Sequence, residues 1–432
     1  MASLAISLPL IPSIFLQPSG IITRVTYSPR ILILYAEAGA GHRRAAEAIA
    51  QPLAERGAAV SLIDAMRFTH PLFRAAYVGG GLKLITRLPR LYRWAYHLSD
   101  QPAIDRVLRG PRYHSQRIST RALFCAIESF QPDAIVCTHF LSAELCAGWR
   151  RSGRLHVPVC TVITDFDPHF MWQHTGTDLY CVPTDAARAR LIQDGIDPAT
   201  VEVTGIPIGR AFAALPDRST TAQRLNLDPH QAVVLIMGGG LGVGAMDAVA
   251  RSLLTHPLDA QIVFITGSNQ ALRRQLKAMS HLLTSSVHAR AAAERERRWI
   301  VRGFVNNMPD WLAAADAAIS KAGGLAGSEL LAAGVPTIIP RMLTGHEALN
   351  AQYLASTGAA LLASSAADGV AQADRLLREP TLRAAMRRAA LRAARPYAAS
   401  LIADRIVVTE RSPARYSLRV TDHVDHPSLS AL

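Results

Sequence analysis

Two glutamates that follow glycine-containing loops are the side chains of this chain with the clearest chemistry. Glu329 lies a few residues after Gly323 and Gly324, and Glu347 lies at the start of the helix predicted after the next loop. A carboxylate repels a phosphate, but it is a good acceptor for the hydroxyl groups of a sugar or a ribose. Backbone N–H groups at helix starts favour an anion instead. The pattern predicts a nucleotide site in which the carboxylates accept hydrogen bonds from the sugar hydroxyl groups and backbone amides bind the phosphates.

A β/α alternation positions these glutamates. Residues 317–319 are predicted to form a buried strand, and a helix begins near Leu325 and ends at Gly334, which suits the left-handed position after a helix. Residues 337–339 form the next predicted strand, and residues 346–357 the next helix. Because the carboxyl ends of parallel strands share one edge of a sheet, both loops should face one crevice, where α/β sheets bind their ligands.

His42 is a candidate base near the beginning of the chain. It follows a predicted strand at residues 30–35 and a loop that contains Gly39 and Gly41. The spacing is GxGH and not GxGxxG, which by itself is weak evidence for a nucleotide. On the first turn of the following helix the dipole favours a neutral imidazole, which can accept a proton near pH 7. A histidine that caps the helix or fills the core explains the same position, so the residues alone leave both interpretations open.

The remaining pattern divides into two β/α units. Further strands are predicted at residues 60–64, 133–137, 159–163, 179–182, 201–203, 233–237, 262–266 and 299–301. Residues 216–229 have low helix and strand propensity, which indicates a linker between the two units.

Two further loops follow predicted strands. Gly238 and Gly239 open the glycine-rich loop 238–244, which can wrap phosphates or let two domains approach closely. Asp165 belongs to the loop 164–169 (TDFDPH), whose acids and histidines do not have the spacing of a known closed metal site. Substrate or interdomain contacts are therefore the expected role of that second loop.

The composition favours anionic partners and a reducing compartment. The 432 residues carry a formal net charge of +13, which suits nucleic acid, anionic lipid or a phosphorylated substrate. The five cysteines have no CxxC spacing, so we expect small core residues, with neither a metal site nor disulfides. Residues 1–23 are uncharged and interrupted by three prolines. We expect a flexible or membrane-touching extension there, or a start codon placed too early; a spanning helix stays an alternative, and a secretory signal fits poorly.

A basic and apolar segment at residues 71–100 interrupts the α/β pattern. It contains a single acid, while Arg87, Arg90, Arg93 and Trp94 lie among further aliphatic and aromatic side chains. Such a mixture is typical of a segment that lies in a membrane interface. An ordinary helical insertion explains the apolar residues but not the scarcity of acids, so the membrane interpretation is favoured.

Four blocks of sequence occur in order over most of residues 30–360. They are residues 39–49 (GAGHRRAAEAI), 164–212 (from TDFDPHF to GIPIGRAF), 235–244 (LIMGGGLGVG) and 302–360. In these blocks the chain resembles the family of monogalactosyldiacylglycerol synthases and bacterial processive diacylglycerol glucosyltransferases, which belongs to glycosyltransferase family 28. The resemblance implies an α/β fold of the GT-B type, in which two Rossmann-like β/α/β domains face each other across a cleft.

The resemblance also implies a reaction. A hexose, galactose or glucose, would move from a UDP-sugar to diacylglycerol or a related glycerolipid, with inversion at the anomeric carbon. Glu329 would hold the ribose, the block GHEALN at residues 345–350 would bind the donor, and His42 would be the base on the acceptor side. The expected donor contacts are Gly238, Gly239, Ser320, Gly323, Gly324, Leu325, Glu329, His346, Glu347 and Asn350, and the expected acceptor and membrane contacts are Gly41, Asp165, Arg87, Arg90, Arg93 and Trp94.

Three positions depart from the family's usual pattern. Ala322 stands where the family usually has proline, His346 where glutamine is common, and Gly209 where an arginine is usual, with Arg210 displaced by one. The resemblance therefore implies the nucleotide of the donor but does not fix its sugar.

The sequence leads to one expected organisation. The parts are an apolar, flexible extension at residues 1–26, an acceptor- and membrane-facing domain at 27–215, a UDP-sugar-binding domain at 216–370, helices at 371–412 and a disordered tail at 413–432. The expected partners are a UDP-sugar, a diacylglycerol-like lipid and an anionic membrane surface, with no nucleic acid, cofactor or metal. The expected location is the cytoplasmic face of the cell membrane, with peripheral attachment. Alternatives left open are a family-28-like transferase with another lipid-linked acceptor, a nucleotide-sugar epimerase of the same fold, and a non-catalytic nucleotide- or lipid-binding module.

Overall fold

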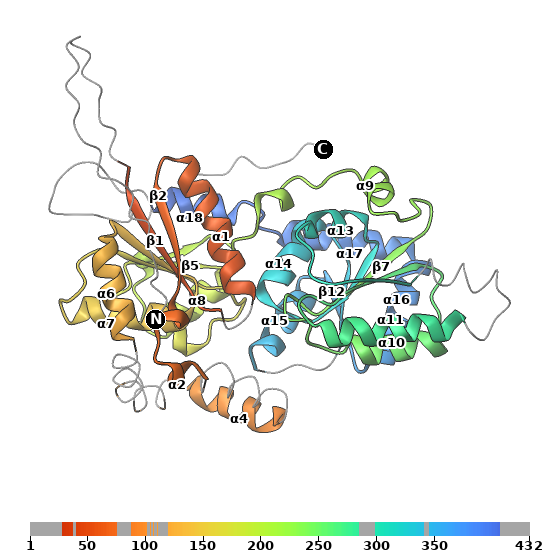
Figure 1. The fold of residues 1–432 in the computed structure, drawn as a ribbon, viewed down its shortest axis with the longest axis horizontal. Helices are drawn as coiled ribbons and strands as arrows, with labels where there is room; N and C mark the ends of the chain where they lie inside the picture. The colour runs from red at the N-terminus through yellow and green to blue at the C-terminus, as the bar shows by residue number, and fades with distance from the viewer. Residues whose placement is uncertain are drawn as a thin grey trace, which may run out of the picture.

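Two parallel six-stranded sheets, each covered by helices, form the framework of the molecule (Figure 1). The computed structural model describes residues 28–37, 40–75, 88–101, 104, 107, 110, 120–284, 299–340 and 345–406. The strand order is β2-β1-β3-β4-β5-β6 in the first sheet and β12-β11-β10-β7-β8-β9 in the second. The expected α/β architecture with two Rossmann-like domains is therefore confirmed.

The first domain is built on the sheet of β1 to β6. Its strands are β1 (Arg30–Tyr35), β2 (Ala59–Asp64), β3 (Ala134–Cys137), β4 (Val159–Val162), β5 (Leu179–Val182) and β6 (Val201–Val203). Its main helices are α1 (Ala40–Glu55), α6 (Arg121–Phe130), α7 (Phe140–Arg151) and α8 (Asp185–Gln193), and the short α2 (Pro71–Arg74) and α4 (Pro89–Ser99) lie below it in Figure 1.

Both faces of this first sheet are buried. Leu32 and Leu34 of β1 pack in a cluster with α6 and α7, while Ile31 and Ile33 pack in a second cluster with α1. Successive side chains of a strand point to opposite faces, so the apolar run ILILY that follows Arg30 is what a central parallel strand requires.

The second domain has the same layered construction. Its strands are β7 (Val233–Met237), β8 (Gln261–Ile265), β9 (Trp299–Arg302), β10 (Ala317–Ser320), β11 (Thr337–Pro340) and β12 (Ala360–Ala363). Its helices are α9 (Arg218–Arg224), α10 (Met246–Thr255), α11 (Gln270–Thr284), α13 (Met308–Ala314), α14 (Gly324–Ala333), α15 (Gly345–Ser356), α16 (Ala366–Arg378) and α17 (Pro380–Ala393).

Residues 216–229, which the sequence indicates as a linker, instead form part of the second domain. They contain α9, whose first turn is capped by Asp217, and Leu225 and Leu227 enter the core cluster of the second sheet. Arg218 forms an ion pair with Asp316 at 2.7 Å. The sequence RSTTAQR has little apolar periodicity, because the anchoring leucines follow the helix and do not lie within it. Strand β12 is a second element that the sequence analysis did not predict.

The last described helix, α18 (Ala398–Arg405), returns to the first domain, where Figure 1 shows it close to α1 and β2. Ile402 packs in the same cluster as the Ile31 side of β1. Arg56 forms an ion pair with Asp404 at 2.6 Å. The chain therefore crosses between the domains twice. Within the described residues no helix combines the length and the apolar character needed to cross a membrane.

The two domains meet where residues 164–166 of the first contact α14 and α15 of the second. Asn350 on α15 is completely buried. Its Oδ1 accepts the backbone N–H of Phe166 at 2.8 Å, and its Nδ2 donates to Oδ1 of Asp165 at 3.1 Å. The ring of Phe166 stacks on that of Tyr353 with centroids 4.4 Å apart. Buried polar groups are costly without partners, so these bonds favour the closed contact.

Gly324 lies at a close approach between the domains. A Cβ at this position would be 1.9 Å from the carbonyl oxygen of Thr164, which is backbone and cannot move aside by rotation. Only a glycine allows α14 to begin this near to the first domain.

We expect Gly324→Ala to destabilise the protein by about 1–3 kcal/mol through overpacking, although alanine is the better helix former. Urea unfolding of the purified protein measures this change. Gly323→Ala is the matched control, because a Cβ at Gly323 meets nothing within 4 Å. A Gly324→Ala variant as stable as the control would show that the domains do not pack this closely in solution.

Candidate active site

The glycine loop after β7 is held in place by the loop after β8. Gly239 and Gly242 have φ angles of +66° and +59°, a region that favours glycine. Ser268 donates its N–H to the carbonyl of Gly240 at 2.9 Å, and Nδ2 of Asn269 donates to the carbonyl of Gly242 at 3.1 Å. The contacts of Ser268 and Asn269 with the glycine loop were not predicted, although the run Gly-Ser-Asn directly after a predicted strand is a turn signal.

The start of α14 presents backbone amides to the same edge of the sheet. Ser320 ends β10 and is buried, with its Oγ donating to the carbonyl of Lys321. Gly323 precedes α14 and provides no side-chain cap for the first N–H groups of the helix. Leu325 on the first turn packs towards the domain core. The predicted donor residues of this loop are therefore brought together around a helix start that suits an anion.

Glu329 projects from α14 in a half-buried environment near the first domain. Burial raises the pKa of its carboxyl group to about 7, and the positive charge of Arg44 opposes that rise. Arg44, on α1, lies over the ring of Phe304 with 5.5 Å to the centroid. This carboxyl group therefore titrates near neutral pH, and in its ionised form it is a strong acceptor for the hydroxyl groups of a ligand.

Glu347, at the start of α15, is paired with a residue that the sequence analysis did not select. Its Oε1 lies 2.7 Å from Nζ of Lys321, and both side chains are largely buried. No sequence signal joins these two residues, because they lie on different loops and meet only in the fold. The side chain of His346 lies outside the described residues.

The amide of Asn350 and the carboxylate of Asp165 bond to each other across the domain boundary, as described above. Nδ2 of Asn350 also donates to the carbonyl of Ala322 at 3.2 Å. The two residues, predicted on the donor side and the acceptor side, thus lie together at the contact between the domains. Their contacts with ligands stay predictions.

His42 is held in one orientation by the first domain. Its Nδ1 lies 2.7 Å from the carbonyl oxygen of Thr138 and 3.2 Å from Oγ1 of Thr164. A carbonyl can only accept, so Nδ1 carries the hydrogen, and in the neutral ring Nε2 then carries the lone pair. Gly41 precedes it on the first turn of α1. This is the tautomer that a base acting through Nε2 requires.

His139 packs edge-on against His42, with ring centroids 4.6 Å apart. Burial lowers the pKa of His139 well below its usual value, and the proximity of His42 lowers it further. His139 is therefore neutral at physiological pH. Its Nδ1 accepts the N–H of Leu141 and so caps α7.

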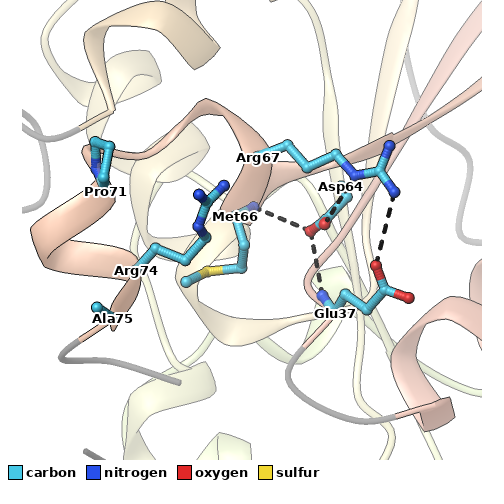
Figure 2. Close-up of a pocket in the computed structure, with 7 residues that line it drawn as sticks. All are labelled: Glu37, Asp64, Met66, Arg67, Pro71, Arg74 and Ala75. Atoms are coloured by element: carbon cyan, nitrogen blue, oxygen red, sulfur yellow. Dashed lines mark hydrogen bonds and ion pairs between the residues drawn. The ribbon is translucent and has the colours of Figure 1, made fainter. Parts of the chain in front are cut away.

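An open pocket of about 680 Å³ lies at the carboxyl ends of β1 and β2 (Figure 2). Its lining consists of Glu37, Asp64, Met66, Arg67, Pro71, Arg74 and Ala75. Figure 2 shows Asp64 accepting the N–H groups of Glu37 and Met66, and Arg67 reaching the carboxylates of Glu37 and Asp64. The pocket lies between the first domain's sheet and α2, on the same sheet edge as the loop that leads to His42.

Helix α4 exposes an apolar face. Leu88, Leu91 and Trp94 follow one another at intervals of three residues, and all three are exposed, Trp94 to 63%. The opposite end of the helix is fixed, because Asp100 accepts the N–H of Phe170 at 2.8 Å. Of the other residues predicted at the membrane, Arg87 and the side chains of Arg90 and Arg93 lie outside the described residues.

The described residues contain no group of three or more His, Cys, Asp or Glu side chains placed to hold a metal ion. Four of the five cysteines are buried and Cys125 is exposed, all of them free thiols.

The sequence matches two family models in succession. Residues 42–208 match the monogalactosyldiacylglycerol (MGDG) synthase model, and residues 233–400 match the glycosyltransferase family 28 C-terminal domain. The probable monogalactosyldiacylglycerol synthase 2, chloroplastic, of Oryza sativa subsp. japonica is 31% identical over 376 residues, which are 80% of this chain and 73% of that protein. The processive diacylglycerol beta-glucosyltransferase of Bacillus subtilis strain 168 is 28% identical over 335 residues, 77% of this chain and 83% of that protein.

Solved structures show the same fold at low sequence identity. MurG of Acinetobacter baumannii has a TM-score of 0.53 and 16% identity, covering 88% of this chain and 99% of that one. MnaA of S. aureus, solved with UDP, has a TM-score of 0.55 and 14% identity, covering 88% of this chain and 95% of that one. The two sheets, the loops at their facing edges and the two successive family matches lead to one conclusion: the chain belongs to the monogalactosyldiacylglycerol synthase family of glycosyltransferase family 28 and has the GT-B fold.

Proposed function

We propose that this protein transfers a hexose, galactose or glucose, from a UDP-sugar to diacylglycerol or a related glycerolipid, with inversion at the anomeric carbon. One contact carries the proposal. The first turn of α1, which bears His42, lies against the glycine loop of the second domain: a Cβ on Gly240 would be 2.3 Å from Cβ of Ala40. A base and a phosphate-binding loop are thus neighbours across the cleft, and the relatives named above are diacylglycerol sugar transferases by name.

His42 acts as the general base in this proposal. The hydroxyl group of a diacylglycerol is a weak nucleophile until its proton is removed. The bond from Nδ1 to the carbonyl of Thr138 places the lone pair on Nε2, which takes that proton as the oxygen attacks the anomeric carbon. Attack opposite to the leaving diphosphate inverts the configuration at that carbon.

The second domain stabilises the leaving group. As the anomeric bond breaks, its electron pair stays on the diphosphate, where negative charge grows. The uncapped N–H groups at Gly324 and Leu325, and those of the loop at Gly238 and Gly239, stabilise this charge without needing to reorganise, while the N–H of Gly323 donates to the carbonyl of Lys321 at 3.0 Å. The closed contact between the domains excludes water and so limits hydrolysis of the donor.

The membrane surface is the expected place of the reaction, because the acceptor is insoluble in water. The exposed face of α4 (Leu88, Leu91, Trp94) and exposed Leu72 on α2 offer apolar side chains to the bilayer. The net charge of +13 favours anionic headgroups. We propose peripheral attachment at the cytoplasmic face of the cell membrane, with no nucleic acid as a partner.

Two alternatives differ in their products. A transferase of family 28 with another lipid-linked acceptor would make a different glycolipid, and a nucleotide-sugar epimerase would release a soluble epimer and need no lipid. The match of residues 42–208 to the MGDG synthase model favours the diacylglycerol transferase over both.

Replacing Glu329 should weaken donor binding. Glu329→Gln removes charge-assisted bonds to the ribose, which cost about 1.5–3 kcal/mol, or about 10–100-fold in the Kd for UDP and in donor KM. The effect falls on KM and not kcat, because the ribose is held alike in the ground and transition states. Because the pKa of Glu329 is about 7, the donor KM of the parent should rise as the pH falls from 8 to 6, and that of the variant should not. Equal UDP affinities of parent and variant at pH 8 would show that Glu329 does not hold the ribose.

Replacing His42 should affect chemistry and not donor binding. We expect His42→Ala to lower kcat by about 10²–10⁴-fold, the usual contribution of a general base, while the Kd for UDP stays unchanged. His139→Gln is the comparison variant: His139 caps α7 and should affect stability more than the pH profile of kcat. Near-parental turnover of His42→Ala would leave His42 a structural residue, and Glu37 would become the next candidate.

Membrane attachment should depend on the exposed face of α4. Changing Leu88, Leu91 and Trp94 together to serine removes apolar contacts worth about 1.5–3 kcal/mol each when fully buried, so co-sedimentation with phosphatidylglycerol-containing vesicles should fall at least about tenfold. Tyr397→Ser, at an aromatic that is also exposed, is the matched control. Binding of the parent should weaken in high salt, which screens charges beyond a few ångströms. Unchanged co-sedimentation of the triple variant would assign attachment to another surface.

A further inference from the structure

Lys321 makes contacts that join three loops of the second domain. It follows β10 directly. Its Nζ lies 2.7 Å from Oε1 of Glu347 at the start of α15. Its Cε lies 3.3 Å from the place that a Cβ on Gly239 would occupy in the glycine loop after β7. A single side chain therefore spans the loops after β7 and β10 and the start of α15.

The surroundings of Lys321 suit a polyanion. The first N–H groups of α14, which begins three residues further along at Gly324, have no side-chain cap. The side chain of Lys321 is 28% exposed and that of Glu347 only 12%, so the lysine is the more accessible member of the pair. Lysine binds phosphate as a compact point charge that can turn about its flexible stem.

We propose that Lys321 binds the β-phosphate of the donor and of the nucleoside diphosphate that leaves. The inference rests on the proposed function. The assignment to the β-phosphate follows from the role proposed for Glu347. If Glu347 accepts hydrogen bonds from the hydroxyl groups of the transferred hexose, Lys321 lies beside that hexose, and the phosphate attached to the hexose is the β-phosphate. When the anomeric C–O bond breaks, its electron pair becomes charge on an oxygen of that phosphate, so the ammonium group stabilises the transition state more than the ground state.

Glu347 has two tasks in this arrangement. Without ligand it holds the ammonium group in the cleft by the ion pair. With donor bound, the ammonium group contacts the β-phosphate, and the carboxylate becomes available to the hydroxyl groups of the sugar. The simpler role for Lys321 is to neutralise Glu347 and no more, and the two roles make different predictions for a double variant.

The test compares the binding of UDP, UMP and uridine to the purified protein by calorimetry. In Lys321→Gln we expect the preference for UDP over UMP to fall by about 10–100-fold, the loss of a charge-assisted hydrogen bond. Affinity for uridine should stay at the parental value, which also shows that the variant is folded. Lys321→Arg should keep part of the preference, because it keeps the charge.

The double variant Lys321→Gln/Glu347→Gln separates the two roles. If Lys321 binds the β-phosphate, the double variant loses the UDP preference as fully as Lys321→Gln does. Recovery of the parental preference in the double variant would overturn the proposal and leave Lys321 as a neutralising partner of Glu347. An unchanged preference in Lys321→Gln would overturn it as well. A parent protein that does not bind UDP would refute the proposed function itself, which is a separate outcome.

Discussion

The close approach of Gly324 to the carbonyl of Thr164 is the constraint on which the site depends. Residues 164–166 contact a residue in each domain. Oγ1 of Thr164 lies 3.2 Å from Nδ1 of His42 in the first domain, and the backbone N–H of Phe166 donates to Asn350 in the second. Separation of the domains would break the bonds that Asn350 makes to residues 165 and 166, which directly follow Thr164 in the chain. Residues 164–166 therefore connect His42, the proposed base, with the helices α14 and α15 that we propose bind the donor, which gives a physical reason for the proposed chemistry to require this contact between the domains.

Charge is balanced within the cleft by pairs that span separate elements. Glu329 of the second domain is influenced by Arg44 of the first, and Glu347 is paired with Lys321. Each acid would be costly to bury alone. In the proposed reaction, the sugar nucleotide supplies hydroxyl groups to the carboxylates and phosphate charge to the cations. The apolar face of α4 (Leu88, Leu91, Trp94), by contrast, is exposed and takes no part in these charge pairs; we propose that it contacts the membrane.

The sequence predicted those parts of the fold that depend on residues close together in the chain. The buried strands, the glycine loops, the stop at Gly334 and the position of His42 on a first helical turn follow from residue types at short spacing. The pairing of Lys321 with Glu347 and the bonds of Asn350 could not be predicted, because they join residues that meet only after folding. The same holds for α9, whose anchors Leu225 and Leu227 lie beyond the helix. Helices were expected at residues 371–412, but the packing of α18 on the first domain's sheet joins distant residues and could not be predicted.

The proposed reaction is the transfer of a hexose from a UDP-sugar to a glycerolipid. The most direct measurement incubates the purified protein with diacylglycerol vesicles and a panel of radiolabelled UDP-sugars, and separates lipid from water-soluble products. The account predicts label in a glycosyl-diacylglycerol from UDP-galactose or UDP-glucose, with a β-linkage if the donor is an α-linked nucleotide sugar. Label found only in free sugar or in an epimerised nucleotide sugar, with none in lipid, would contradict it.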